Sequence, residues 1–255
     1  MPIVTTDLKV YGSLNTLSDG GAIDTSAAKK IGTNGKFNDG AGANVFPDVT
    51  GDQAAAGIVL YRKVFLRNEH VTLSLQRPFT WFTAQVNILS ADQASIGRGV
   101  DDANDNDPVQ ANLTQLTANA VIAIVSDGVD TRVVTVEGTD TTGAFQSEAI
   151  TLNGATEVVG LKTFQKIYAA FVTATSATRT VTIKQGSGGA TRGTVAPNKV
   201  ISFIFFQPAT KTAGLPSPDI APNADAGEWL KLNIPAGAPA GAYSFTVKSE
   251  GDSAA

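Results

Sequence analysis

His70 is the only imidazole in this 255-residue sequence. A Ser-His-Asp relay would therefore have to use His70 as its base. Its neighbours, Arg67-Asn68-Glu69, are polar and lie between two strand-like segments. The sequence contains no Gly-x-Ser-x-Gly elbow that would present a nucleophile. We therefore predict a polar turn at His70, no catalytic residue and no enzymatic activity.

The sequence contains no cysteine, which excludes a disulfide framework, an iron–sulfur centre, a cysteine zinc site and a cysteine nucleophile. The glycine-rich tract over residues 186–189 lacks the Gly-Lys-Ser/Thr continuation of a phosphate-binding loop. A carboxylate pair of the glycosidase type stays open at this stage, because such a pair forms in space rather than in sequence. We predict no cofactor.

The interval 91–112 carries Gly97, Gly99 and an acidic cluster over residues 101–107, which predicts a loop. The acidic cluster is the best candidate for a metal-binding loop. Asp102, Asn104 and Asn106 alternate in the way that the first ligands of a calcium loop do. The glycine and glutamate expected further along such a loop are replaced by Asp107 and Leu113. A calcium loop and a solvated acidic loop tip both remain possible, and the two departures favour the loop tip.

The charge balance limits the classes of partner. Nineteen Lys and Arg residues face 23 Asp and Glu residues, and the net charge is −4. We expect no nucleic-acid partner, since no basic surface would neutralise phosphates. We expect no membrane partner either, because no apolar run approaches the roughly 20 residues of a membrane helix.

Short segments with alternating apolar and polar residues predict strands throughout the chain. Tyr61–Arg67 and Trp81–Ile88 are rich in β-branched and aromatic residues. Short strands separated by turn signals are expected at 121–125, 132–137, 146–152, 166–173 and 179–184. In the segment 228–234, Leu230, Leu232 and Ile234 fall on one face. No long stretch has helical periodicity. The predicted fold class is all-β, an antiparallel β-sandwich.

The chain divides into three predicted parts. Residues 1–57 are rich in turn formers and predict an extended N-terminal arm that lies on another surface, although surface loops on the same core fit as well. Residues 58–120 plus 195–255 form the predicted β-sandwich domain. Residues 121–194 form a second β module inserted into it, which is easy at a loop tip because the ends of the host domain stay close together.

Aromatic residues give the candidates for an interface. Phe205 and Phe206 are neighbours in an apolar run, so in a strand one of them would point towards a partner subunit. Trp229 is a further interface candidate. Trp81 and Trp229 are also the candidates for a sugar-stacking platform, which a carbohydrate-binding module of a host-recognition fibre would need.

Several strings resemble structural proteins of tailed-bacteriophage virions. These strings are GGAIDT over residues 20–25, VFPDVTGDQAAAG over 45–57, LYRKVFLRN over 60–68, and the ending IPAGAPAG over 234–241 with YSFTVKSEGD over 243–252. The middle of the chain is similar to immunoglobulin-like segments of phage particle proteins. The strings there are VTVEGTDTTG over 134–143, EAITLNG over 148–154 and KTFQKI over 162–167.

The resemblance implies a non-enzymatic virion component that is assembled in symmetric copies. It would bind other virion proteins, either major capsid subunits or subunits of the tail or baseplate, and would itself form homo-oligomers. Capsid decoration, or cement, is the favoured expectation. A tail or baseplate protein and the carbohydrate-binding module are the alternatives. The resemblance carries over no functional residue, because this group has no catalytic motif.

Overall fold

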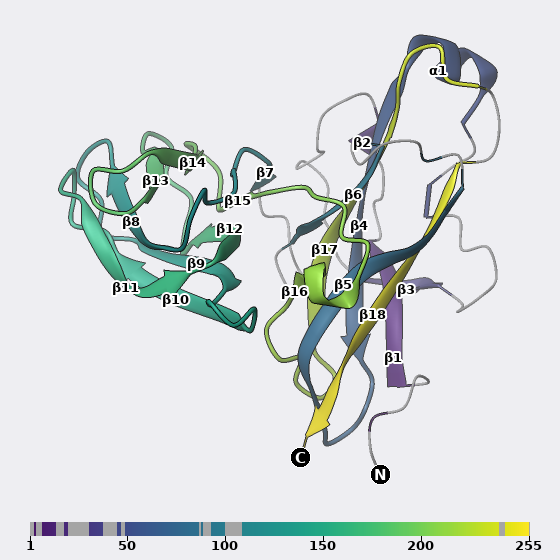
Figure 1. The fold of residues 1–255 in the computed structure, drawn as a ribbon, viewed down its shortest axis with the longest axis horizontal. Coiled ribbons are helices and arrows are strands. Elements are labelled where there is room, and N and C mark those ends of the chain that lie inside the picture. The colour runs from purple at the N-terminus through teal and green to yellow at the C-terminus, as the bar shows by residue number, and fades with distance from the viewer. Residues whose placement is uncertain are drawn as a thin grey trace. The chain divides into compact units, whose positions relative to one another are not determined.

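The computed structural model describes residues 3, 7–13, 18–19, 31–37, 45–46, 49–86, 88, 93–99, 109–239 and 243–254. The chain divides into two compact units (Figure 1). The host unit comprises residues 1–106 and 205–255, and the inserted unit comprises residues 107–204. Both units are built from strands that pair almost entirely antiparallel, and the predicted all-β fold is confirmed.

A six-stranded sheet forms one layer of the host unit, in the order β3-β1-β4-β17-β6, with β2 also paired to β4. Its strands are β1 (Leu8–Ser13), β2 (Ser18–Asp19), β3 (Ile31–Phe37), β4 (Ile58–Asn68), β6 (Ala94–Arg98) and β17 (Asp225–Ile234). The central pair β4 and β17 is in register from Ile58↔Ile234 to Arg67↔Asp225. This register puts Leu60 opposite Leu232 and Leu66 opposite Ala226. From Leu230 to Ile234, buried and half-buried residues alternate, as expected for this segment.

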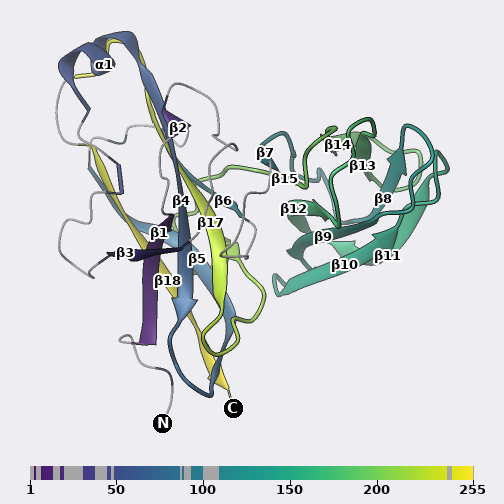
Figure 2. The same ribbon diagram turned by 180° about the vertical axis from the view of Figure 1, so that it is seen from behind.

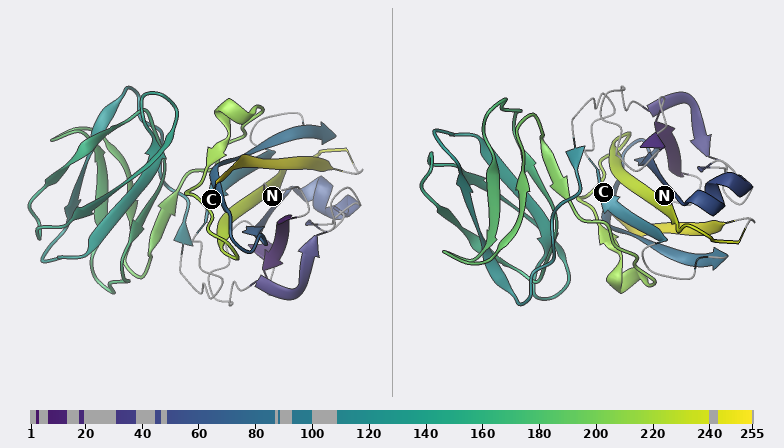
Figure 3. Two further views of the ribbon diagram at one scale, coloured as in Figure 1. Left: turned by 90° about the horizontal axis from the view of Figure 1, so that it is seen from below. Right: turned by 90° about the horizontal axis from the view of Figure 1, so that it is seen from above.

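A three-stranded sheet in the order β16-β5-β18 forms the other layer of the host unit. Its strands are β5 (Ser74–Val86), β16 (Leu215–Pro216) and β18 (Ser244–Ala254), and the short 3-10 helix η2 (Lys211–Ala213) precedes β16. The long strands β5 and β18 run side by side (Figure 3).

Two apolar clusters hold the layers of the host unit together. In one, Leu75 of β5 packs with Leu66, Ala226 and Ile220. In the other, Phe245 of β18 packs against Leu60, Leu232 and Ile234 of the larger sheet. Fully burying one such aliphatic side chain contributes about 1.5–3 kcal/mol, so these contacts fix which face of each strand points inward.

The α-helix α1 (Gly51–Ala56) leads into β4 (Figure 2). Thr50 and Gln53 form a capping box, in which the Thr50 hydroxyl accepts the Gln53 N–H and the Gln53 side chain accepts the Thr50 N–H. The next residue, Gly57, has a φ of +81°, which residues with a side chain rarely adopt. In the described residues, no helix is long and apolar enough to cross a membrane.

The inserted unit contains two sheets. A five-stranded sheet has the order β10-β9-β12-β15-β7, and a four-stranded sheet has the order β11-β8-β13-β14. The bounds of the first sheet are β7 (Val109–Gln110), β9 (Val133–Thr139), β10 (Phe145–Thr151), β12 (Lys166–Val172) and β15 (Ile201–Phe203). The bounds of the second sheet are β8 (Ala120–Ser126), β11 (Val158–Phe164), β13 (Val181–Gln185) and β14 (Thr191–Val195).

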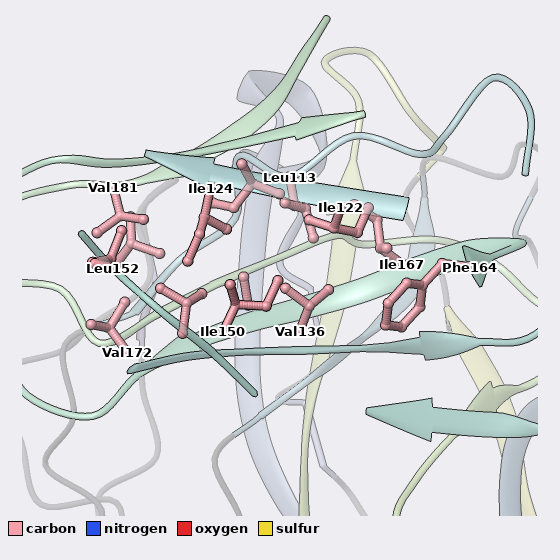
Figure 4. Close-up of a cluster of buried hydrophobic side chains, with 14 residues drawn as sticks. Leu113, Ile122, Ile124, Val136, Ile150, Leu152, Phe164, Ile167, Val172 and Val181 are labelled. Atoms are coloured by element: carbon pink, nitrogen blue, oxygen red, sulfur yellow. The ribbon is translucent and has the colours of Figure 1, made fainter. Parts of the chain in front are cut away.

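One aliphatic core joins the two sheets of the inserted unit (Figure 4). Ile122 and Ile124 of β8 face Val134 and Val136 of β9, and all four side chains are buried completely. The chain changes sheet six times: between β7 and β8, β8 and β9, β10 and β11, β11 and β12, β12 and β13, and β14 and β15. These crossings make the inserted unit a β-sandwich rather than a single folded sheet.

The structure differs from the sequence expectations at several elements. The interval 91–112 had the signature of a loop, but Ala94–Arg98 is the buried strand β6, because it pairs with β17. The apolar run 200–206 is not one strand. Ile201–Phe203 pairs with β12 in the inserted unit, whereas Phe206 bridges to Ile96 of β6 in the host unit.

The ends of the chain segments also differ from the expected parts. The inserted unit is longer than 121–194 at both ends, because β7 and β15 complete its five-stranded sheet and Leu113 belongs to its core. Where residues 1–57 are described, they do not form an arm on a separate surface. Leu8–Ser13 pairs with β4 as a strand of the host sheet.

Candidate interaction surfaces

His70 organises the turn between β4 and β5. Its ring atom Nδ1 accepts hydrogen bonds from the backbone N–H groups of Thr72 at 3.1 Å and Leu73 at 2.9 Å. The backbone N–H of His70 donates to Asn68 Oδ1. Asn68 is fully buried and donates from Nδ2 to the carbonyls of Leu73 and Ile220. The imidazole therefore has a structural task in the polar turn that the sequence predicted.

The described part of the chain contains no candidate metal site. There, no three or more His, Cys, Asp or Glu side chains come together in a way that could hold an ion. Asp102, Asn104 and Asn106 lie outside the described residues, so the calcium loop stays a prediction.

Both tryptophans are buried, which corrects their role as exposed candidates. Trp229 of β17 is 3% exposed and stands between Lys63 of β4 and Gly97 of β6 in the sheet. Trp81 of β5 is 8% exposed, and the Lys248 ammonium lies 5.4 Å from its ring centroid. Neither indole offers the open face that sugar stacking or a subunit contact would require.

Phe205 and Phe206 both lie in the host unit, where the contacts of the Phe205 ring and of the Phe206 backbone are with different strands. The N–H and carbonyl of Phe206 both bond to Ile96, which places Phe206 beside β6. The Phe205 ring lies 5.7 Å from the Tyr61 ring, and Lys231 Nζ lies 5.9 Å from its centroid. Both phenylalanines are half-buried in the host unit, and burial raises the pKa of Tyr61.

The helix α1 and the turn after β17 are joined at one end of the host unit. The N–H of Gly237 lies 3.1 Å from the carbonyl oxygens of Ala54 and Ala55 and so satisfies the last turn of α1. A Cβ on Gly57 would lie 2.9 Å from the nitrogen of Ala236, so the close approach requires glycine there. The paired ends of β4 and β17, residues 57–59 and 233–236, line an open groove of about 360 Å³ here.

A line of charged side chains follows β18. Glu250 accepts from Lys211 Nζ at 2.7 Å and lies 3.0 Å from Lys248 Nζ. These two ammonium groups, Lys211 first, hold the pKa of the Glu250 carboxyl below its ordinary value. Further along, Arg77 pairs with Asp252. All five side chains are more than a third exposed, so each ion pair contributes little to the free energy of unfolding. Together they give the surface along β18 its charges.

The outer strands of the four-stranded sheet of the inserted unit are blocked. Residues 160–162 of β11 oppose the single residue Ile122 of β8, which makes a bulge. The Glu148 carboxylate accepts the N–H groups of Leu161 and Lys162 in this bulge. On the opposite edge, β14 bonds to the segment before β8 through Thr114 N–H and the Arg192 carbonyl. Bulges and covered edges prevent pairing with other chains.

The carboxyl groups of the inserted unit with lowered pKa values have structural partners. The Arg132 guanidinium holds the pKa of Asp130 below its ordinary value, aided by the Ser126 hydroxyl. Hydrogen bonds from Lys184 and then from the Gly188 N–H lower the pKa of Glu157 to about 2. These groups fasten loops and do not form a pair across a cleft.

No family model, no curated protein and no solved structure matches this chain. The described residues instead offer three kinds of surface: the joined end at α1, the half-buried Phe205, and the charged edge strand β18. Sequence reasoning missed β18 as a surface, since its alternating residues indicate a strand but not its position in a sheet.

Proposed function

We propose that the chain is a structural component of a tailed-phage virion that binds neighbouring subunits and stabilises the particle. Within that class we favour a capsid decoration, or cement, protein. It works without catalysis or a cofactor, and its partners are major capsid subunits and further copies of itself.

One observation carries the proposal: strings that resemble the phage group lie together in the fold although they are far apart in sequence. The string over residues 45–57 contains the capping box, α1 and Gly57. The string over 234–241 supplies the turn that meets them, through the contact of Gly237 with Ala54 and the close approach of Ala236 to Gly57. The string over 60–68 forms most of β4, and its Leu60 lies in one apolar cluster with Ile234 of the string over 234–241. Three of the resembling strings thus meet in one part of the host unit.

The insertion of one β-sandwich into another also supports the proposal. The entering strand β7 pairs in parallel with the leaving strand β15, with Val109 beside Ile201. Neighbouring strands lie about 4.8 Å apart, so the host chain resumes close to where it stopped. The immunoglobulin-like character of the inserted unit is part of the proposal, and its sheet-crossing connections favour it.

The proposed mechanism is linkage between binding and stability. A protein that binds the assembled lattice, and not the free subunits, stabilises that lattice by about 2.7 kcal/mol per site when its concentration is 100 times its Kd. Many weak sites then act together on one particle.

Particle labelling tests the proposal. Purified virions should contain the chain, and an antibody against the inserted unit should label the heads in electron micrographs. Heads depleted of the chain should release DNA at a lower temperature, and purified chain should restore the original temperature, while an unrelated β-sandwich protein of similar charge should not. Label confined to the tail would assign the tail or baseplate role instead. Particles without the chain would refute the proposal.

A further inference from the structure

The strand β18 forms an edge of its sheet. The hydrogen bonds of the neighbouring strand β5 show which backbone groups of β18 point outward. On the far side of β5, Ser217 N–H bonds to the Pro78 carbonyl, and Phe82 N–H bonds to the Pro208 carbonyl. The backbone groups of a strand residue point to the same side, and this side alternates along the strand. The backbone groups of residues 78, 80 and 82 of β5 therefore point away from β18. Those of Phe79 and Trp81 point towards it.

The same alternation assigns the groups of β18. Phe79 stands opposite Glu250 and Trp81 opposite Lys248, so Glu250 and Lys248 use their backbone groups within the sheet. Ser249 stands opposite Thr80, and Val247 stands opposite Phe82. The N–H and carbonyl groups of Val247 and Ser249 consequently point to the outer edge. Among the described residues, β18 pairs with no strand except β5.

Charge defines the partner that fits this edge. If β18 paired antiparallel with β18 of a second copy about Ser249, each Lys248 would stand opposite the other copy's Glu250. If the pairing were centred on Lys248, the two lysines would face each other, which is unfavourable. Of these two registers, only the one centred on Ser249 places opposite charges across from each other.

We propose that two copies of the chain join through antiparallel pairing of their β18 strands about Ser249. The outward groups of Ser249 bond to those of the second Ser249, and two Lys248–Glu250 pairs flank them. This isologous contact has the two-fold symmetry that most closed protein dimers use. The inference deepens the proposed function, on which it rests, by naming the edge at which copies meet.

Two bulges in the neighbouring strand β5 limit the strength of the contact. The extra residues are Thr83 at one bulge and the pair Arg77 and Pro78, opposite Gly251, at the other, so β18 pairs regularly only from Val247 to Glu250 between them. Bulges and charged residues are the usual means of limiting edge pairing. The contact is therefore weak for an isolated pair and becomes effective where many copies are held on one particle.

Sedimentation equilibrium of the purified chain tests this inference, at concentrations up to about 1 mM, where weak contacts become populated. The wild-type chain should form dimers reversibly. Ser249→Pro removes an outward backbone N–H without removing a backbone bond to β5, and it should abolish the dimer. It also removes the 2.9 Å contact between the hydroxyls of Ser249 and Thr80, as does Ser249→Ala, so the melting temperature and the circular dichroism spectrum of these two variants should agree. The matched variant Ser249→Ala keeps this N–H and should still dimerise.

A charge exchange tests the register independently of proline. Lys248→Glu should weaken the dimer at least tenfold, and Lys248→Glu combined with Glu250→Lys should restore it. A wild-type chain that stays monomeric over the whole range, or a Ser249→Pro variant that dimerises like the wild type, would overturn the inference. Labelled heads together with a monomeric chain would refute this contact alone, whereas dimers without labelled particles would refute the proposed function alone.

Discussion

The Thr80 hydroxyl on β5 donates a 2.6 Å hydrogen bond to the buried carboxylate of Glu228 on β17. This bond connects the three-stranded sheet of the host unit to the six-stranded sheet. Glu228 stands opposite Arg98 of β6 in the register, and Arg98 is fully buried. A polar contact thus joins the two layers inside the host unit, where the loss of a partner is costly.

Thr80→Val should destabilise the host unit by about 1–3 kcal/mol, because the isosteric side chain takes a donor away from a buried carboxylate. Chemical denaturation monitored by tryptophan fluorescence measures this change, since Trp81 and Trp229 both lie in the host unit. The matched variant Thr83→Val changes an exposed position of the same strand and should alter the free energy by less than about 0.5 kcal/mol. Equal effects of the two variants would contradict the assignment.

Arg77 has a φ of +48°, which is unfavourable for a residue with a side chain. Arg77→Gly should therefore be more stable than Arg77→Ala by about 1 kcal/mol. Both variants lose the exposed ion pair with Asp252, so the comparison isolates the backbone term. Thermal denaturation of the two variants side by side gives the difference, and an alanine variant as stable as the glycine variant would show that the positive φ is absent in solution.

Gly160 and Glu148 should act as one unit in the bulge of β11. A Cβ at Gly160 would lie 2.5 Å from Glu148 Oε2, so Gly160→Ala should cost about 1–3 kcal/mol. Glu148→Ala removes the obstructing carboxylate, and Gly160→Ala should cost at least about 0.5 kcal/mol less in that background. A double-mutant cycle from denaturation curves measures the coupling, and strictly additive effects would refute it.

The sequence predicted strands well where alternation was regular, as in β4 and β17. It missed β6 because Gly97 and Gly99 indicated a loop, whereas the structure uses Gly97 opposite the large Trp229 side chain. It missed β11 because the bulge at Gly160 interrupts the alternation. Burial of the two tryptophans and the edge position of β18 depend on the order of strands in the sheets, which local residue patterns do not encode.

Acid should loosen the turn between β13 and β14, where the Glu157 carboxylate accepts hydrogen bonds from Ser187 and Gly188. The pKa of Glu157 falls from an ordinary value of 4.5 to about 2, so the folded state binds the proton less readily than the unfolded state. Its stabilising effect is therefore complete above pH 4.5 and is lost as the pH falls towards 2. The stability difference between wild type and Glu157→Gln should shrink across this interval.

The carboxyl carbon of Glu157, followed by NMR, gives the midpoint directly. Lys184→Met removes the first cause of the low pKa, the 2.8 Å bond from Lys184 Nζ, and should move this midpoint upward. An unchanged midpoint in that variant would mean that Lys184 does not hold the carboxylate in solution.

The boundaries of the inserted unit can be tested with two fragments. Residues 107–204 contain the complete aliphatic core and all the strands of both sheets, so this fragment should fold alone with a cooperative transition. Residues 121–194, the boundaries that the sequence indicated, lack β7, β15 and Leu113. Without β15, one edge of β12 is left unpaired, and without Leu113 the core has a cavity. Together these losses should cost several kcal/mol, which is roughly the stability of a small domain.

Dispersed amide NMR signals from the longer fragment and collapsed signals from the shorter one are the expected result. A shorter fragment that folds as stably as the longer one would move the boundary back to residues 121 and 194.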